Sequence, residues 1–232
     1  MIRLYVEAPL ATGAAVDATE GQAHHLGGVM RRTVGDPVNL FNGRDGEWTC
    51  RIVSLSRGKA TLVPENLLRP QSGDADLWLL FAVLKRDTTD LVVQKATELG
   101  VSMLLPVFTE RTNAGRVNLD RLRSIAIEAA EQSERLTIPT VRPAAHLHDN
   151  LAAWPSDRAL FVALERADAP PLKQFAGPAG LLIGPEGGFG PRDREAIDRS
   201  RFVRPVSLGP RILRAETAAI VGLALLQAPG WG

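Results

Sequence analysis

Apolar and polar positions follow two different patterns along the chain, and the pattern changes near residue 70. In the first part, short alternating stretches are separated by glycine-containing turns such as Asn42-Gly43 and Asp45-Gly46. Strands and turns of this kind are typical of an antiparallel meander or a small barrel. The expected strands cover residues 38–41, 47–55 and 60–63, and a short helix covers residues 21–31. We therefore predict a β domain over residues 1–69, followed by a linker at residues 69–74 that is rich in turn-forming residues.

The second part alternates between continuous apolar runs and helical periods. Residues 77–84 form an unbroken apolar run, which is typical of a strand covered on both faces. Further strands are expected at residues 101–108, 159–164, 180–183 and 202–208, and helices at residues 87–99, 118–133, 192–200 and 216–227. This alternation predicts an α/β domain over residues 74–232, with a mostly parallel sheet flanked by helices.

Two loops of this α/β domain are candidates for chemistry, because open α/β sheets bind ligands beyond the carboxyl ends of their strands. The loop in residues 181–190 is dense in glycine, which lets the backbone approach a ligand closely. It is neither a Walker loop nor a GxGxxG loop. The loop in residues 208–218 leads into a helix that is apolar nearly all round, so that helix must be buried in a core or a subunit interface. We therefore expect Arg214 and Glu216, at its start, to be buried and to need partners.

Composition narrows the possible functions only modestly. Hydrophobic residues make up 45% and charged residues 23% of the 232, which is ordinary for a globular protein. The formal net charge is only +1, so contacts with a nucleic acid would need local clusters of arginine. The first residues lack a signal-peptide core, and the longest apolar run is too short to span a bilayer. These features predict a cytoplasmic protein that does not use a membrane.

The single cysteine, Cys50, excludes an intrachain disulfide and a cysteine-based zinc site. The four histidines lack metalloprotease spacing, so we expect no metal. Cys50 could serve as a nucleophile. It shares one face of its expected strand with Trp48 and Ile52, however, and this favours a place in the core.

The two glycine-containing loops together resemble the paired C-terminal motifs of the SPOUT methyltransferases. The motifs read Ile-Gly-Pro-Glu-Gly-Gly-Phe at residues 183–189 and Leu-Gly-Pro-Arg-Ile-Leu-Arg-Ala-Glu-Thr-Ala at residues 208–218. Across essentially the whole chain, the likeness is to the small-subunit (16S) rRNA uracil-N3-methyltransferase family. Matching segments are residues 94–101, 110–111 and 128–135, and residues 25–31 with Gly35-Asp36 resemble that family's PUA-like domain.

The resemblance implies a knotted (trefoil) SPOUT domain preceded by a PUA-like β-barrel, with S-adenosylmethionine as cofactor. It further implies a homodimer that acts on 16S rRNA, as part of the 30S ribosomal subunit. A knot of this kind is a rare exception to the rule against threaded chains. The implied cofactor residues are Leu164, Gly184, Pro185, Glu186, Gly187, Leu208, Gly209, Ile212, Leu213, Arg214, Thr217 and Ala218.

Methylation of uracil N3 requires that a proton leave a base that carries it at neutral pH. We expect Arg214 and Arg111 to stabilise the developing uracil anion, and Glu186 or Glu216 to accept the proton. The expected RNA contacts, mostly to phosphates, are His25, Arg31, Arg32, Lys85, Arg86, Arg111 and Arg135.

Three alternatives stay open at the level of the sequence. A non-catalytic RNA-binding module would need only the β domain, and the intact loops disfavour it. A dinucleotide-dependent oxidoreductase would fit the α/β pattern, but the GxGxxG loop is missing. A methyltransferase of tRNA or of large-subunit (23S) rRNA would keep the same chemistry, and only the whole-chain resemblance favours 16S rRNA over these.

Overall fold

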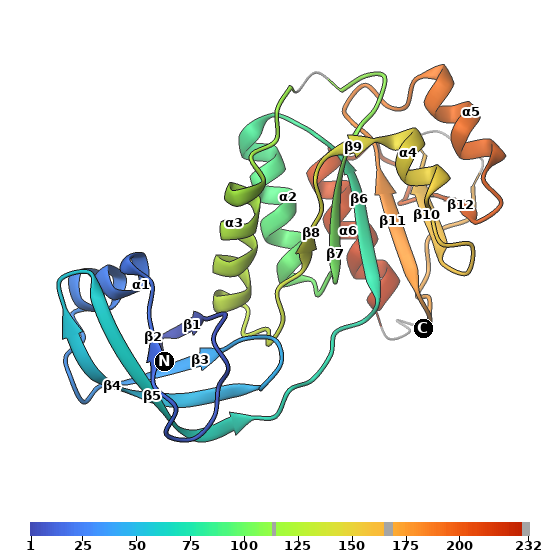
Figure 1. Cartoon of the computed structure of the whole chain (residues 1–232). Helices are drawn as coiled ribbons and strands as arrows, with labels where there is room; N and C mark the ends of the chain where they lie inside the picture. Colours follow the sequence, from blue (N-terminus) through green and yellow to red (C-terminus); the bar gives the residue numbers. More distant parts are fainter. Residues whose placement is uncertain (113–114, 165–168, 229–232) are drawn as a thin grey trace. The chain divides into compact units, whose positions relative to one another are not determined.

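The computed structural model describes residues 1–112, 115–164 and 169–228, so a few residues of the predicted second domain, its end at residue 232 included, lie outside the described residues. The chain divides into two compact units, each with a sheet of its own (Figure 1). Unit 1 comprises Met1–Gly73 and Ala130–Ile138, and unit 2 comprises Asp74–Ala129 and Pro139–Gly232. Unit 1 thus takes in a segment that the sequence pattern gives no reason to separate from its neighbours.

Unit 1 is built on a five-stranded sheet with the order β1-β3-β4-β5-β2. The strands are β1 (Arg3–Tyr5), β2 (Val16–Asp17), β3 (Pro37–Phe41), β4 (Glu47–Ser56) and β5 (Lys59–Arg69). β1 pairs with β3 in parallel, and the other neighbouring pairs are antiparallel. Gly43 and Gly46, in the turn between β3 and β4, have φ values of 79° and 81°, as tight glycine turns require. The predicted meander is confirmed.

The helix expected over residues 21–31 consists of two shorter elements. α1 (Glu20–His24) begins with a capping box, in which Thr19 and Gln22 each accept a hydrogen bond from the other's backbone amide. A π-helical turn, η1 (His25–Val29), follows directly. Arg31, with φ of 51°, lies just beyond η1 in the left-handed region, where the chain leaves the helical path.

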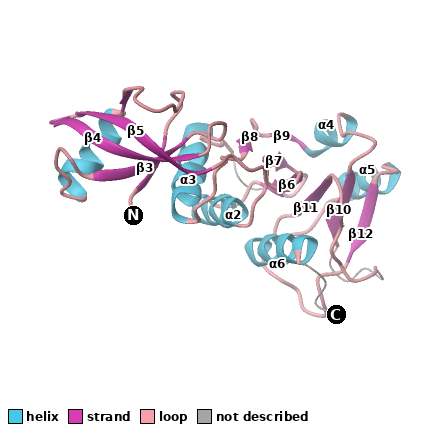
Figure 2. Ribbon diagram, turned by 90° about the horizontal axis from the view of Figure 1, so that it is seen from below, coloured by secondary structure: helices cyan, strands magenta, loops and turns pink. Residues whose placement is uncertain are grey.

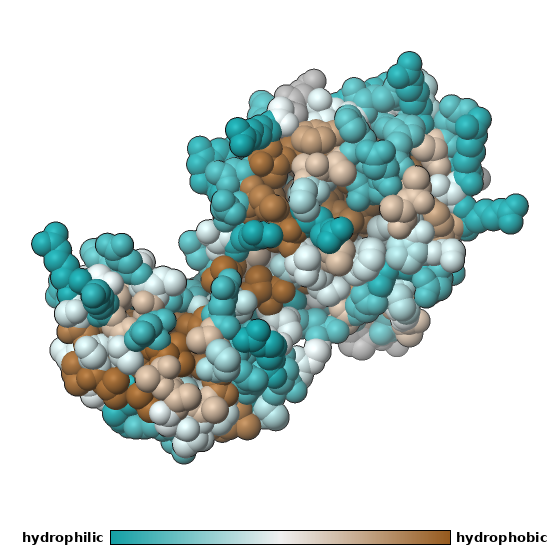
Figure 3. All heavy atoms as spheres, viewed as in Figure 1, coloured by the Kyte–Doolittle hydropathy of each residue, from teal (hydrophilic) through white to brown (hydrophobic). Residues whose placement is uncertain are grey.

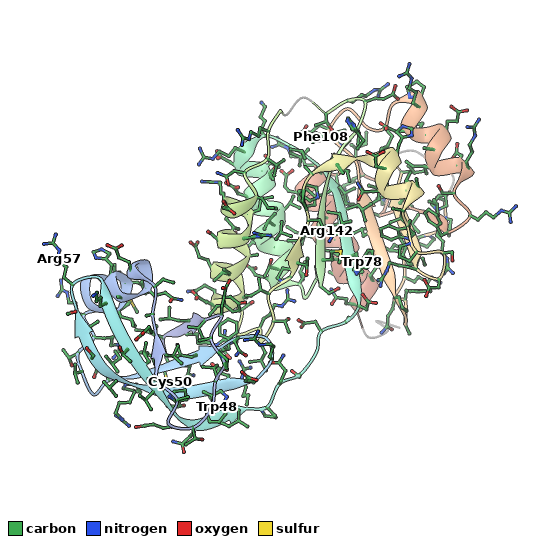
Figure 4. The ribbon with its side chains drawn as sticks, viewed as in Figure 1. Trp48, Cys50, Arg57, Trp78, Phe108 and Arg142 are labelled. Carbon is green, nitrogen blue, oxygen red and sulfur yellow. The ribbon has the colours of Figure 1, made fainter. Side chains whose placement is uncertain are left out.

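Cys50 lies in the core of unit 1 and is 0% exposed. Ile52 belongs to the same core cluster and the partly buried Trp48 packs against it, as their shared strand face predicts. Figure 4 labels Trp48 and Cys50 in this unit. Burial raises the pKa of the Cys50 thiol to about 12. The thiol is therefore protonated at neutral pH and unsuited to nucleophilic attack, which confirms the interpretation of Cys50 as a core residue.

Unit 2 is built on a parallel sheet with the order β12-β10-β11-β6-β7-β8, in which β9 also pairs with β7. The strands are β6 (Leu77–Ala82), β7 (Met103–Phe108), β8 (Thr140–Val141), β9 (Ala145–His146), β10 (Ala159–Ala163), β11 (Ala179–Ile183) and β12 (Val203–Val206). Every pair in this sheet is parallel, so the predicted mostly parallel sheet is confirmed. β6, which the unbroken apolar run predicts to be covered on both faces, is buried except for the half-buried Trp78, and β11 is buried along its whole length.

Helices cover both faces of this sheet. They are α2 (Arg86–Glu98), α3 (Leu119–Gln132), α4 (Leu147–Ala152), α5 (Pro191–Arg199) and α6 (Ala215–Gln227). Figure 2 shows α2 and α6 on one face, and α4 and α5 on the other. The short helix α4 has no counterpart in the sequence prediction. Within the described ranges, no helix has both the length and the apolar character needed to cross a bilayer.

Candidate active site

The loops at the carboxyl edge of the parallel sheet surround two cavities. The strand order changes direction between the neighbours β6 and β11, because β6 continues to β7 on one side while β11 pairs with β10 on the other. Loops diverge at such a point and leave room for a ligand. The loops after β6, β7 and β11 supply most of the lining of one cavity, and the loops after β10, β11 and β12 supply most of the lining of the other.

The first of these, which we call the glycine-loop cavity, has a volume of about 630 Å³. Its lining is Ala163, Leu164, Ile183, Gly184, Pro185, Glu186, Gly188, Phe189, Arg194, Ser207, Leu208, Gly209, Pro210, Arg211, Ile212, Leu213, Arg214, Ala215 and Ala218. Backbone and apolar side chains make up most of this wall, with three arginines and one carboxylate among them. Small-molecule and cofactor sites have this size and this mixture of many apolar and few polar groups.

The loop after β11 closes tightly over an aromatic ring. The amide of Gly188 donates a hydrogen bond to the carbonyl of Pro185 at 2.8 Å, which forms a turn. Phe189 is only 4% exposed, and a Cβ atom on Gly184 would lie 3.0 Å from its ring. A side chain at residue 184 would therefore press on the ring of Phe189, and glycine lets the loop fold back against that ring.

The second cavity, which we call the arginine cavity, has a volume of about 1040 Å³. Its lining is Val83, Leu84, Lys85, Arg86, Thr89, Asp90, Glu110, Arg111, Arg116, Val117, Asn118, Arg121, Leu122, Pro185, Glu186 and Gly187. The five basic side chains in this lining outnumber the three acidic ones. A concave surface with a positive surplus attracts the phosphates of a nucleic acid.

The basic side chains of the arginine cavity are not equivalent. Arg121 forms hydrogen bonds to Asp90, with 3.1 Å between Arg121 Nε and Asp90 Oδ1, and this contact raises the pKa of the Arg121 guanidinium. Lys85 and Arg86 are exposed, and their side chains form no hydrogen bond or ion pair with the described residues. Arg121 therefore holds the cavity wall, while Lys85 and Arg86 are available to a ligand.

The two cavities share one wall. Pro185 and Glu186 line both of them, and Glu186 is exposed. Next to them, Arg111 Nη1 donates a hydrogen bond to the carbonyl of Gly187 at 2.5 Å. Arg111 comes from the loop after β7, whose last residue, Phe108, is labelled in Figure 4. A carboxylate and a guanidinium thus lie where the contents of the two cavities would meet.

Most of the residues predicted for the cofactor come together around one space. Ten of the twelve line the glycine-loop cavity: Leu164, Gly184, Pro185, Glu186, Leu208, Gly209, Ile212, Leu213, Arg214 and Ala218. Gly187 lines the arginine cavity instead, and Thr217 lines neither of the two.

The four residues predicted for catalysis are divided between the cavities. Arg214 lines the glycine-loop cavity, Arg111 lines the arginine cavity and Glu186 lines both, whereas Glu216 lines neither. The expected burial of Arg214 and Glu216 is not what the structure shows, because Arg214 is exposed and Glu216 is half-buried. Arg214 is the N-cap of α6 and belongs to the loop, so it does not share the buried face of that helix.

The residues predicted to contact RNA fall in both units. Lys85, Arg86 and Arg111 line the arginine cavity. In unit 1, two predicted RNA contacts are exposed, His25 and Arg31, and a third, Arg32, is half-buried. Their neighbours in the sequence include three exposed apolar side chains, those of Val29, Met30 and Val34. Figure 3 shows apolar side chains at the surface of this unit.

Arg135 differs from the other predicted RNA contacts. It is 8% exposed, and its Nη2 atom donates to Thr137 Oγ1 at 3.1 Å. Its guanidinium is therefore held inside unit 1, where a phosphate has little access to it, and we leave Arg135 out of the RNA surface proposed below.

Several lining residues were not predicted from the sequence. Arg211 lies in the second loop motif, which could have pointed to it. Arg194 belongs to α5 and Arg121 to α3, where the pattern is that of ordinary surface helices. Only the packing of those helices against the loops brings these arginines to the cavities.

Comparison with known proteins agrees with this arrangement. Residues 71–227 match the family model described as an RNA methyltransferase domain, and residues 18–65 match the model described as an RNA methyltransferase PUA domain. The chain is 30% identical to the ribosomal RNA small subunit methyltransferase E of Rickettsia conorii, over 98% of this chain and 96% of that protein. It is 34% identical to the protein of the same name from Synechocystis sp., over 97% of this chain and 77% of that protein.

Two solved structures resemble the whole chain. One is the ribosomal RNA small subunit methyltransferase E of Neisseria gonorrhoeae bound to S-adenosyl methionine, with a TM-score of 0.86 and 30% identity over 97% of this chain and 95% of that one. The other is a Legionella pneumophila protein in complex with the bound cofactor SAM, with a TM-score of 0.88 and 28% identity over 97% of this chain and 96% of that one.

Proposed function

Because the chain belongs to the ribosomal RNA small subunit methyltransferase E family, we propose that it methylates N3 of a uridine in 16S rRNA, with S-adenosylmethionine as the methyl donor. Like its relatives, it is an S-adenosylmethionine-dependent rRNA methyltransferase. The observation that carries the finer proposal is the shared wall at Glu186, which separates a cofactor-sized cavity from a basic one.

The glycine-loop cavity fits S-adenosylmethionine by size and by chemistry. Leu164, Leu208 and Leu213 offer apolar surface for the adenine ring, and the backbone of the two loops offers hydrogen-bonding groups to read its edge. The exposed guanidiniums of Arg211 and Arg214 suit a carboxylate such as that of the methionine part. The cofactor supplies an activated methyl group on a sulfonium, so the protein mainly has to position the acceptor.

The uracil side of the reaction needs charge stabilisation and a proton acceptor. N3 lies on the Watson–Crick edge, so the base has to be unpaired or flipped out to reach the site. Arg111 and Arg214 would stabilise negative charge on the uracil oxygens as the proton leaves. Glu186, which faces both cavities, would accept that proton directly or through a water. Glu216 lines neither cavity, and we leave it out of this scheme.

The basic side chains predict how the RNA is held. Lys85 and Arg86 would contact phosphates at the arginine cavity, and His25, Arg31 and Arg32 would do so from unit 1. Phosphate contacts fix the register of an RNA and carry little sequence information. The match of residues 18–65 to an RNA methyltransferase PUA domain supports a role of unit 1 in RNA binding.

We also propose that the enzyme is a cytoplasmic homodimer that acts on the assembled 30S subunit, with the loops of the glycine-loop cavity forming a trefoil knot. α6 supports the dimer, because its side chains Ile220, Val221 and Leu225 are only half-buried and Ala224 is exposed. An apolar helix side of this kind is typical of a subunit interface. Light scattering coupled to size exclusion should therefore give twice the mass of one chain.

Mass spectrometry of 16S rRNA nucleosides tests the reaction. Cells with and without the gene should differ in 3-methyluridine, which should be present only when the protein is made, and purified protein should restore it on 30S subunits. Titration calorimetry with S-adenosylmethionine tests the cofactor separately. A protein that binds RNA but releases no heat with the cofactor would be a non-catalytic RNA-binding module.

A further inference from the structure

Two carboxylates outside the predicted site join the loops that meet at the shared wall. Glu110 follows β7, at the beginning of the loop that carries Arg111. Asp193 lies in the first turn of α5, directly after the glycine-rich loop, and is 1% exposed. A carboxylate buried to this extent needs hydrogen-bond donors, and each of the two carboxylates accepts at least one hydrogen bond from a backbone amide of the other's segment.

The start of α5 shows why Glu110 is needed there. The first amides of a helix have no partner within it, and a serine or threonine N-cap usually accepts from them. Here the N-cap is Gly190, which has no side chain, and Pro191 has no N–H. Glu110 Oε2 accepts instead from the amides of Arg192, at 2.7 Å, and Asp193, at 3.4 Å.

Asp193 in turn accepts a hydrogen bond from the backbone of the loop after β7. Its Oδ2 atom accepts from the amide of Glu110 at 2.9 Å and from that of Gly190 at 3.3 Å. Each carboxylate thus caps the backbone of the other's segment, and we call this reciprocal arrangement the Glu110–Asp193 clamp. Hydrogen bonds of backbone amides to ionised carboxylates are among the stronger ones in proteins.

The clamp favours glycine at residue 190 because there is no room for a side chain there, and not because the backbone conformation requires glycine. Its φ of −71° is open to any residue. A Cβ atom at this position, however, would lie 2.2 Å from Glu110 Oε2, so any larger residue has to displace that carboxylate. Replacing Gly190 by alanine should therefore displace the Glu110 carboxylate from the amides of α5 while both carboxylates stay in the chain.

The clamp acts on the residues proposed for the chemistry. Arg111 follows Glu110 directly, and its Nη1 donates to the carbonyl of Gly187 in the glycine-rich loop. Gly187 is the neighbour of Glu186, which lines both cavities. Two links, the clamp and this hydrogen bond, therefore fix Arg111 and Glu186 relative to each other.

We propose that Glu110 and Asp193 are positioning residues of the methyl-transfer reaction, which act by setting the mutual placement of Arg111 and Glu186. This rests on the proposed function. Loss of the clamp should then lower turnover far more than cofactor affinity, because the glycine-loop cavity is lined mainly by other residues. A misplacement of about 1 Å at a reacting centre can reduce a rate roughly 100-fold.

The test uses the full-length protein and three variants of the clamp. Glu110→Ala should lower kcat on 30S subunits roughly 100-fold, while the calorimetric Kd for S-adenosylmethionine changes little. Glu110→Gln keeps an oxygen acceptor for the two amides and should restore most of the turnover. Gly190→Ala should reproduce the loss, with Glu110 still present. The matched control is Glu195→Ala, which removes an exposed carboxylate of α5 that pairs with Arg199 on the same helix.

The possible failures can be told apart. If the wild-type protein forms no 3-methyluridine, the proposed function is wrong whatever the variants do. If the wild type is active and both Glu110→Ala and Gly190→Ala match it in kcat, the positioning role is overturned. It is also overturned if Glu110→Gln is as impaired as Glu110→Ala. Should Glu110→Ala fail to fold, Gly190→Ala and Glu110→Gln still decide the question, since Gly190→Ala keeps both carboxylates and Glu110→Gln keeps an acceptor oxygen at residue 110.

Discussion

Unit 1 and unit 2 differ in what their charged side chains contact. In unit 1, Arg3 is 8% exposed and Glu47 is 1% exposed, and their side chains meet at 2.8 Å. Arg3 also donates to the carbonyls of Ala130, Glu131 and Arg135, so the strand β1 and the segment Ala130–Ile138 are held together by one guanidinium. Glu47 accepts further bonds from Asn39 and Arg69.

In unit 2, the charges around the cavities are mostly left without such partners. Arg214, Arg86 and Glu186 are exposed, and their side chains form no hydrogen bond or ion pair with the described part of the chain. Their hydrogen-bonding capacity remains available to a ligand. The comparison indicates that the buried charges of unit 1 are used within the fold, whereas the accessible charges of unit 2 are the ones that we propose for the chemistry.

The largest effect expected from this comparison is on the stability of unit 1. Glu47→Ala leaves Arg3 as a buried charge without its carboxylate, which costs about 3–5 kcal/mol of unfolding free energy. Denaturant titration followed by circular dichroism should show the loss, and amide exchange should place it in β3, β4 and β5. Cofactor binding by unit 2 should persist under native conditions.

The matched control for Glu47→Ala is Glu65→Ala. Glu65 also pairs with an arginine, Arg51 at 2.7 Å, but both side chains are at least one-third exposed. Exposed ion pairs contribute little to stability. Equal losses in the two variants would show that burial does not distinguish the two pairs.

The next largest effect is on catalysis in unit 2. Arg214→Ala should lower kcat by roughly 10²–10³-fold, the usual consequence of removing one group that stabilises developing charge. The free energy of unfolding should stay close to that of the wild type, because Arg214 is exposed and has no partner in the described chain. A variant with near-normal turnover would remove Arg214 from the mechanism, and a strongly destabilised one would contradict the contrast between the units.

The sequence predicted the regular parts of both units. Alternation and glycine turns indicated the meander of unit 1, and the continuous apolar run at β6, with the strands and helices that alternate after it, indicated the parallel sheet. The sequence predicted the part of the site that lies in two loops, each of them one continuous segment of the chain. These loops supply most of the ten expected cofactor residues that line the glycine-loop cavity. These signals are local, and periodicity and turn chemistry read local structure well.

Long-range packing could not be predicted in this way. The segment Ala130–Ile138 belongs to unit 1, and among the contacts that join it there are hydrogen bonds to Arg3, a residue more than a hundred positions away in sequence. Arg194 reaches the glycine-loop cavity only through the placement of α5. Arg214 was expected to be buried because its helix is apolar, but an N-cap residue does not share the buried face of its helix.

A smaller effect is expected for RNA affinity. The double variant Lys85→Ala, Arg86→Ala should lower the slope of log Kd against log salt by about 2 units, roughly one for each phosphate that the protein no longer neutralises. Arg123→Ala is the matched control, because Arg123 is exposed on α3 and lines neither cavity. Filter binding to 30S subunits over a salt series measures the slopes. An unchanged slope in the double variant would place the RNA elsewhere.

The smallest effect is the response of unit 1 to acid. Burial alone would raise the pKa of Glu47, but hydrogen bonds from Arg3 and Arg69 outweigh it and hold the pKa below the ordinary 4.5. The unfolded chain therefore binds the proton more readily, so the stabilisation by Glu47 is full above pH 4.5 and is lost as the pH falls through the folded-state pKa. Asp45 and Glu65, whose pKa values are also lowered, act in the same direction in wild type and variant alike.

The gap in stability between the wild type and Glu47→Gln should thus narrow when denaturant titrations are repeated from about pH 6 down to about pH 3. A gap that stays constant over this range would mean that Glu47 does not exchange its proton on unfolding there, and the buried ion pair of unit 1 would then contribute through packing rather than charge.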